Sequence, residues 1–258
     1  CSNTTGTQNV AVGAFAGDEI DTALYNTAVG FAALSADAGN ANTAMGRCAL
    51  ANNTGSNNTG LGYQSLKSNT SASNNTAVGV DSLTANTTGT KNTSVGKNSL
   101  ASNTTGNCNT AVGTTSLLSN TTASFNTAIG TASLLSNTTG TQNTSIGRTS
   151  MEANTTGSNN SAVGFRSLQA NTTGNCNTSM GHSSLHENTT GCFNIGIGTC
   201  SLCSNTTGDS NIAIGSASLK SHTTASNNTA VGFCALYSNT TASNNVAVGR
   251  SSLESNTT

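Results

Sequence analysis

Asn126 to Gln142 reads NTAIGTASLLSNTTGTQ, and the same pattern can be laid over nearly every other part of the chain. The pattern is N-T-A-φ-G-x-x-S-L-x-x-N-T-T-G-x-x, where φ is an aliphatic residue. Its glycine recurs every 17 residues, apart from two steps of 16, at Gly13, Gly30, Gly46, Gly62, Gly79, Gly96, Gly113, Gly130, Gly147, Gly164, Gly181, Gly198, Gly215, Gly232 and Gly249. A fixed period of this kind is typical of solenoids, in which each repeat forms one coil. We therefore expect an all-β, fibrous fold, a parallel β-solenoid (β-roll or β-helix) of about fifteen 17-residue coils.

The repeat runs through the whole chain, so we interpret residues 1–258 as a single repeat array. Residues 1–41 are degenerate coils, and residues 42–258 are regular ones. The degenerate part holds Asp18, Glu19, Asp21 and Asp37, which we interpret as sequence drift or as proximity to a boundary of the array, because no ligand spacing supports a cation site. The array starts and stops inside a repeat, which predicts a segment of a longer fibre.

Composition excludes several classes of protein. Only 7% of the residues are charged and 3% are aromatic, with no Trp or Pro, so an ordinary globular core cannot be built. Low charge and absent proline also argue against a disordered chain. A net charge of −1 argues against nucleic-acid binding and polybasic membrane binding. No apolar window reaches the roughly 20 residues of a membrane span, so we expect no membrane contact within this segment.

We call the first five residues of the repeat the pentad. We expect the pentad to form a β-strand, because Gly, Asn and Thr are unfavourable in helix interiors. The second and fourth pentad residues share one face of a strand, and we expect this face to point inward because Ile or Val sometimes replaces the Thr. The pentad Gly predicts a turn with positive φ or a close approach of two backbones.

The rest of the repeat is predicted to complete the coil. Ser-Leu is expected to form a second short strand with its Leu inward, and N-T-T-G is expected to form the closing corner. Coils stacked about 4.8 Å apart would then align identical residues in Asn, Thr and aliphatic columns.

The pentad with its preceding residue carries a resemblance to a known family. Residues 227–232 read NNTAVG and residues 244–249 read NNVAVG, which resemble the N-S-V-A-I-G signature of trimeric autotransporter adhesin head repeats. The resemblance covers the pentad in nearly every repeat, about a third of the residues, and the 17-residue coil is a longer variant. It implies a left-handed parallel β-roll, assembled as a homotrimer on a bacterial surface. Similar repeats occur in phage and viral tail fibres.

The N-T-T triplets are sequons for N-glycosylation, recurring in register along the chain. Their asparagines are glycosylation candidates: Asn3, Asn69, Asn86, Asn103, Asn120, Asn137, Asn154, Asn171, Asn188, Asn205, Asn239 and Asn256. A second set of sequons overlaps the pentad, as at Asn74, Asn92, Asn143, Asn159, Asn177 and Asn227. The alternative is purely structural, because turns and stacked ladders select the same residues. His222 replaces Asn in one triplet.

The cysteines and histidines give weak signals. Cys176 and Cys192 would fall on adjacent coils, one column apart, which makes them the disulfide candidate. The single C-x-x-C motif at 200–203 lacks the partner pair of a zinc site. His182, His186 and Glu187 would share a face only in a helix, so we expect no metal site there. No acids and bases cluster around a pocket, so we expect no enzyme activity and no cofactor other than covalent glycans.

Together these features predict a structural, extracellular fibre segment, glycosylated and self-associating, that serves as a spacer, shaft or surface coat. An alternative is an adhesin or tail-fibre shaft that supports binding of a cell-surface or glycan receptor. A minor alternative is an ice-binding solenoid, but T-x-T ranks occur only patchily, as at Thr88 to Thr90 and Thr139 to Thr141.

Overall fold

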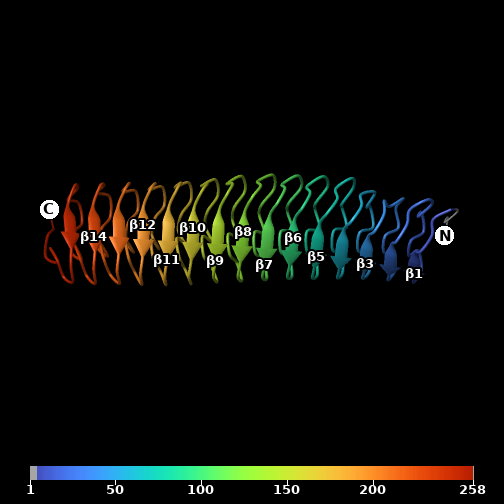
Figure 1. Cartoon of the computed structure of the whole chain (residues 1–258), viewed down its shortest axis with the longest axis horizontal. Coiled ribbons are helices and arrows are strands. Elements are labelled where there is room, and N and C mark those ends of the chain that lie inside the picture. Colours follow the sequence, from blue (N-terminus) through green and yellow to red (C-terminus); the bar gives the residue numbers. More distant parts are fainter. Residues whose placement is uncertain (1–4, 258) are drawn as a thin grey trace. The chain divides into compact units, whose positions relative to one another are not determined.

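The structure, a computed structural model, describes residues 5–257. The chain divides into two compact units, Cys1–Asn126 and Thr127–Thr258. In each unit the strands lie side by side in chain order, with irregular backbone joining each strand to the next (Figure 1). Residues 5–257 contain strands, turns and bends and no helix. The expected all-β, parallel β-solenoid fold is confirmed.

Each described coil contributes one strand of three residues. The first unit contains β1 (Val10–Val12), β2 (Thr27–Val29), β3 (Thr43–Met45), β4 (Thr59–Leu61), β5 (Thr76–Val78), β6 (Thr93–Val95) and β7 (Thr110–Val112). The second contains β8 (Thr127–Ile129), β9 (Thr144–Ile146), β10 (Ser161–Val163), β11 (Thr178–Met180), β12 (Ile195–Ile197), β13 (Ile212–Ile214), β14 (Thr229–Val231) and β15 (Val246–Val248). Within each unit every strand pairs in parallel with the next, one repeat further along the chain.

The strands face the opposite way from the prediction. From β2 onward the middle residue of each strand is buried, as Ala128 and Ala162 are, while the second and fourth pentad residues are half-buried or exposed. The reason is the narrow interior of the coil. A Cβ atom added at Gly60, a middle residue, would lie 3.2 Å from Leu50 Cγ and 3.1 Å from Ser65 Oγ. Only Gly, Ala or Ser fits there, so the larger Thr and aliphatic side chains lie outside.

The Ser-Leu segment is a turn rather than the predicted second strand. Residues 131–136 form a turn in which Ala132 and Leu134 have φ values of 54° and 53°. This left-handed conformation costs a residue other than glycine about 1–2 kcal/mol. The Leu134 N–H nevertheless donates to Ser150 O at 2.9 Å in the next coil. Stacking hydrogen bonds therefore hold the turn, and Leu134 is buried as predicted.

The pentad glycine meets both parts of its prediction. Gly164 has a φ of 135°, and a Cβ atom added to it would lie 2.5 Å from Gly181 O in the next coil. The repeat therefore needs glycine here for its conformation and for the close stacking of coils.

Two asparagine columns run through the interior of each unit and confirm the expected ladders. We call the first residue of the pentad the pentad asparagine and the first residue of N-T-T the triplet asparagine. The pentad residue Asn143 accepts the N–H of Asn160 through Oδ1 at 3.0 Å. The triplet residue Asn171 donates through Nδ2 to Asn154 Oδ1 at 2.7 Å and to Gly174 O at 3.0 Å. Buried amides that are saturated in this way take the place of a large apolar core.

His222 interrupts the triplet column. Its Nε2 bonds to Ala225 O at 2.8 Å, as a triplet asparagine would. Its Nδ1 and the Oδ1 of Asn205 are buried, and neither has a hydrogen-bond partner. Burial lowers the pKa of His222 from the ordinary value of 6.5.

We expect His222→Asn to stabilise the chain by about 1–3 kcal/mol, because an amide can bond to both neighbours in the column. The variant should also lose a component of acid sensitivity. Below pH 6.5 the unfolded His222 takes up a proton that the folded, buried ring resists, so the stability of the natural chain falls as the pH falls. Urea denaturation of both chains at about pH 7.5 and about pH 5.5 measures both effects. An unchanged stability, or the same pH dependence in the variant, would contradict this account.

Candidate functional surfaces

The structure buries the triplet asparagines that were predicted to carry glycans. The members with no exposed surface are Asn69, Asn86, Asn103, Asn120, Asn137, Asn154, Asn171, Asn188, Asn205 and Asn239. Asn256, in the last coil, is half-buried, and Asn3 lies outside the described residues. A glycan would attach to Nδ2, the atom that Asn171 uses for two buried hydrogen bonds. The buried triplet asparagines are therefore structural residues, and their prediction as surface acceptors for glycans is corrected.

The second set of sequons divides between the interior and the surface. Asn92, Asn143 and Asn177 are pentad asparagines and are buried. Asn74, Asn159 and Asn227 precede the pentad asparagine and are exposed, with positive φ values of 61–64°. Their side chains point away from the ladders, so the accessible acceptors lie at the residue before the pentad.

The predicted Cys176–Cys192 disulfide is absent from the structure. Cys48, Cys108, Cys176, Cys192, Cys200, Cys203 and Cys234 are all free thiols. The Sγ atom of Cys192 instead lies 3.3 Å from the N–H of Asn175 and 3.4 Å from Thr190 O. Cys192 thus occupies the corner position at which the side chain of Ser, Asn or Asp accepts a backbone N–H in neighbouring coils.

The C-x-x-C motif brings two thiols together without making a metal site. Burial raises the pKa of the Cys203 thiol to about 12, with smaller contributions from Cys200, which hydrogen-bonds to it, and from Glu187. Cys203 is therefore a neutral thiol at neutral pH, and neutral thiols are poor nucleophiles and metal ligands. Residues 5–257 contain no group of three or more His, Cys, Asp or Glu side chains that could hold a metal ion.

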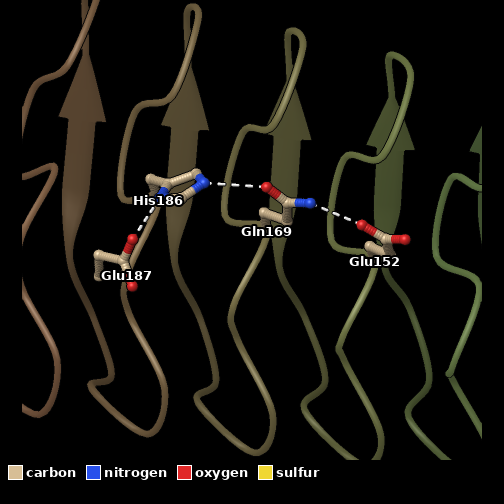
Figure 2. A network of polar contacts seen from close by, with 4 residues as sticks. All are labelled: Glu152, Gln169, His186 and Glu187. Atoms are coloured by element: carbon tan, nitrogen blue, oxygen red, sulfur yellow. Dashed lines mark hydrogen bonds and ion pairs between the residues drawn. The ribbon is translucent and has the colours of Figure 1, made fainter.

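A polar ladder runs over three coils of the second unit (Figure 2). Gln169 Nε2 donates to Glu152 Oε2 at 2.6 Å, and His186 Nε2 lies 2.9 Å from Gln169 Oε1. His186 Nδ1 lies 2.6 Å from Glu187 Oε1. Each nitrogen of the His186 ring thus faces one oxygen of a neighbouring side chain. The ladder joins side chains at the surface and leaves no acid or base directed at a substrate.

The strands carry an uncharged surface. We call the outward side chains of the first and third residues of each strand the sheet face. None of these residues is charged in any of the fifteen strands. The third residues are aliphatic, and several are strongly exposed, with 45% for Met180 and 68% for Val248. Each unit therefore carries a Thr-rich column beside an aliphatic one, which consists of Val, Leu and Met in the first unit and of Val, Ile and Met in the second.

No family model matches the chain, and no curated protein matches its sequence. The surface formed by residues 5–257 contains no pocket. The same residues include no helix with the length and apolar character of a membrane span. The columns of side chains that the coils display are therefore the features that bear on function.

Proposed function

We propose that this chain is a structural, non-enzymatic segment of an extracellular fibre, a shaft or spacer, that self-associates through its sheet face. The observation that carries the proposal is the uncharged, half-exposed aliphatic column of this face. In the second unit, seven steps of about 4.8 Å make a stripe about 34 Å long. Soluble monomers rarely leave a contiguous apolar stripe of such length uncovered.

A second copy of the chain is the partner that suits this face. A column that repeats once per coil is matched along its length only by a surface with the same spacing. Another copy supplies this spacing, and two uncharged faces meet without leaving a buried charge. A homotrimer is the assembly that the resemblance to adhesin heads implies.

The test is the mass in solution of the full chain, measured by light scattering. We expect the natural chain to have three times the monomer mass. Combining Ile146→Lys, Met180→Lys and Ile214→Lys should give a monomer, because each substitution would bury a charge in the interface.

The matched control places the same three charges elsewhere on the second unit. Thr139, Thr156 and Thr173 are exposed on the triplet corner, and their replacement by Lys should leave the assembly intact. A monomeric natural chain would refute self-association. Two variants that assemble equally well would show that the sheet face is not the interface.

Sugar, where the host attaches it, is expected on the exposed sequons and not on the buried triplets. Peptide mapping by mass spectrometry of chain made in a glycosylating host should find glycans on Asn74, Asn159 or Asn227. Glycans on Asn120, Asn137 or Asn154 would contradict the burial of these side chains.

Ice binding is a second candidate, favoured by one observation. The outward Thr and aliphatic columns form a regular, uncharged array on the sheet face. Ice binding needs this array in contact with water, whereas self-association buries it. Thermal hysteresis of a solution of the natural chain would support ice binding, and its absence would remove this candidate. In an adhesin or a tail fibre, the same shaft would also support binding to a receptor.

A further inference from the structure

The second unit displays three basic side chains around one aromatic ring. The Cζ atoms of Arg148 and Arg166 lie 5.6 and 5.1 Å from the centre of the Phe165 ring. The His182 ring lies 5.4 Å from the same centre, tilted by 35°. We call these four residues the Phe165 cluster. Arg148, Arg166 and His182 are exposed, and Phe165 is half-buried between them.

The positive charge of the cluster has no counterpart. Within the part of the chain that the structure describes, neither arginine forms an ion pair with a carboxylate. The acidic side chains of the polar ladder bond to other residues, Glu152 to Gln169 and Glu187 to His186. Two guanidinium groups near one ring repel each other, and an anion placed between them would relieve this repulsion.

A column-matched site in the first unit shows the contrast. Arg47 lies 5.8 Å from the centre of the Phe31 ring and 5.6 Å from that of Tyr63. Its Nη1 also donates to the Tyr63 hydroxyl at 3.3 Å. Arg47 thus contacts two aromatic rings. In the Phe165 cluster, by contrast, a single ring contacts two guanidinium groups and an imidazole. The Phe165 cluster therefore gathers two guanidinium charges, whereas the first site has one.

We propose that the Phe165 cluster binds an acidic polysaccharide, a polymer with carboxylate or sulfate groups. Guanidinium groups recognise such planar or tetrahedral oxyanions through paired hydrogen bonds. The described surface has no pocket, so a small anion would be held weakly. A polymer gains from repeated contacts along one side of the coils.

A second cationic site lies in the same column of the same unit. Arg250 has its Cζ atom 5.8 Å from the centre of the Phe233 ring. Arg148 follows β9 and Arg250 follows β15, so six coil steps, roughly 29 Å, separate them. A linear polyanion can reach both sites. Nucleic acid fits less well, because it needs many phosphate contacts and the chain has only 8 Lys and Arg residues.

The test measures binding of the full chain to three immobilised polymers: dextran sulfate, polygalacturonate and neutral dextran. We expect binding to at least one acidic polymer and none to dextran, with affinity falling as salt is added. The acidic polymer that binds more tightly identifies sulfate or carboxylate as the preferred group.

Variants locate the site. Combining Arg148→Gln with Arg166→Gln should weaken the binding about tenfold or more, because two charge-assisted contacts are lost. The matched control is Arg47→Gln, which removes one cation of the same column and should change the binding less than twofold. A third variant, Arg148→Lys with Arg166→Lys, keeps the charge and should retain part of the affinity. Circular dichroism checks that each variant is folded.

Three results would overturn the proposal. They are equal binding by the natural chain and the folded Gln variant, an equal loss in Arg47→Gln, and tighter binding to a DNA fragment than to either acidic polymer. Failure to bind any polyanion at low salt would be a fourth such result. None of these results bears on self-association through the sheet face, because the proposed site lies beyond the pentad glycine and is tested by different variants.

Discussion

Asn171→Ala should destabilise the chain by about 4 kcal/mol, because the substitution breaks three buried hydrogen bonds at once. Asn171 donates to Asn154 Oδ1 at 2.7 Å and to Gly174 O at 3.0 Å, and its Oδ1 accepts from Asn188 Nδ2 at 2.9 Å. Alanine leaves Asn154 Oδ1 buried without a donor, while Gly174 O and Asn188 Nδ2 each keep one other hydrogen bond. Because the coils stack, the lost contacts lie on both sides of the altered coil.

The measurement is urea denaturation of the full chain, with amide hydrogen exchange to locate the weakened coils. Thr173→Ala is the matched control. Thr173 lies two residues away in the same triplet, is exposed, and keeps its backbone bond to Thr189 O at 3.3 Å. We expect it to change the stability by less than about 0.5 kcal/mol. Equal changes in stability for the two variants would show that Asn171 is exposed and freely replaceable. The triplet would then again be a candidate glycan site.

Gly164→Ala should cost about 3 kcal/mol or more, through conformational strain and a steric clash together. Gly164 has a φ of 135°, and its added Cβ would lie 2.5 Å from Gly181 O and 2.7 Å from Gly181 C. Both atoms belong to the backbone of the next coil, so relief of the clash requires the coils to move apart. The stacking hydrogen bonds around that point would then lengthen.

Gly249 provides a control in which only the strain is present. It occupies the same position of the last coil with a φ of 123°, but a Cβ added there meets nothing within 4 Å. Gly249→Ala should therefore cost about 1–2 kcal/mol, and the difference between the two variants in urea denaturation measures the clash. Equal effects would show that close stacking is not what requires the pentad glycine.

The period of the sequence is sufficient to predict the coil, its parallel stacking and its ladders. A repeat of 17 residues with Gly, Asn and Leu at fixed places leaves few other folds. The inward direction of Leu134 and the close approach at Gly164 follow from residue type alone.

The direction of the strand could not be obtained from alternation. Alternation shows that Thr127 and Ile129 share a face, but it does not show which face is inside. The informative signal was the small size of the middle residue, Ala128, because a narrow interior accepts only a small side chain. Aliphatic residues at the outer positions suggested burial within one chain, whereas on a self-associating surface they would be buried between chains.

The predictions of a second strand at Ser-Leu and of glycans on the triplet asparagines were wrong for different reasons. Leu134 takes a left-handed conformation that residue preferences disfavour, and hydrogen bonds between coils stabilise it there. For Asn171, the sequon and the ladder require the same residue, so only the direction of the side chain distinguishes them. The Phe165 cluster was missed because its main members are separated by whole repeats. Writing the sequence in rows of 17 would have placed Arg148, Phe165 and His182 in one column.

The most direct test of this account is a cryo-EM map of the assembled fibre at side-chain resolution. The account predicts that the sheet faces of separate copies contact one another, with Ile146 and Met180 buried between chains. It also predicts triplet asparagines stacked inside each coil without attached density. Sheet faces open to solvent, or branched density on Asn154 and Asn171, would contradict it.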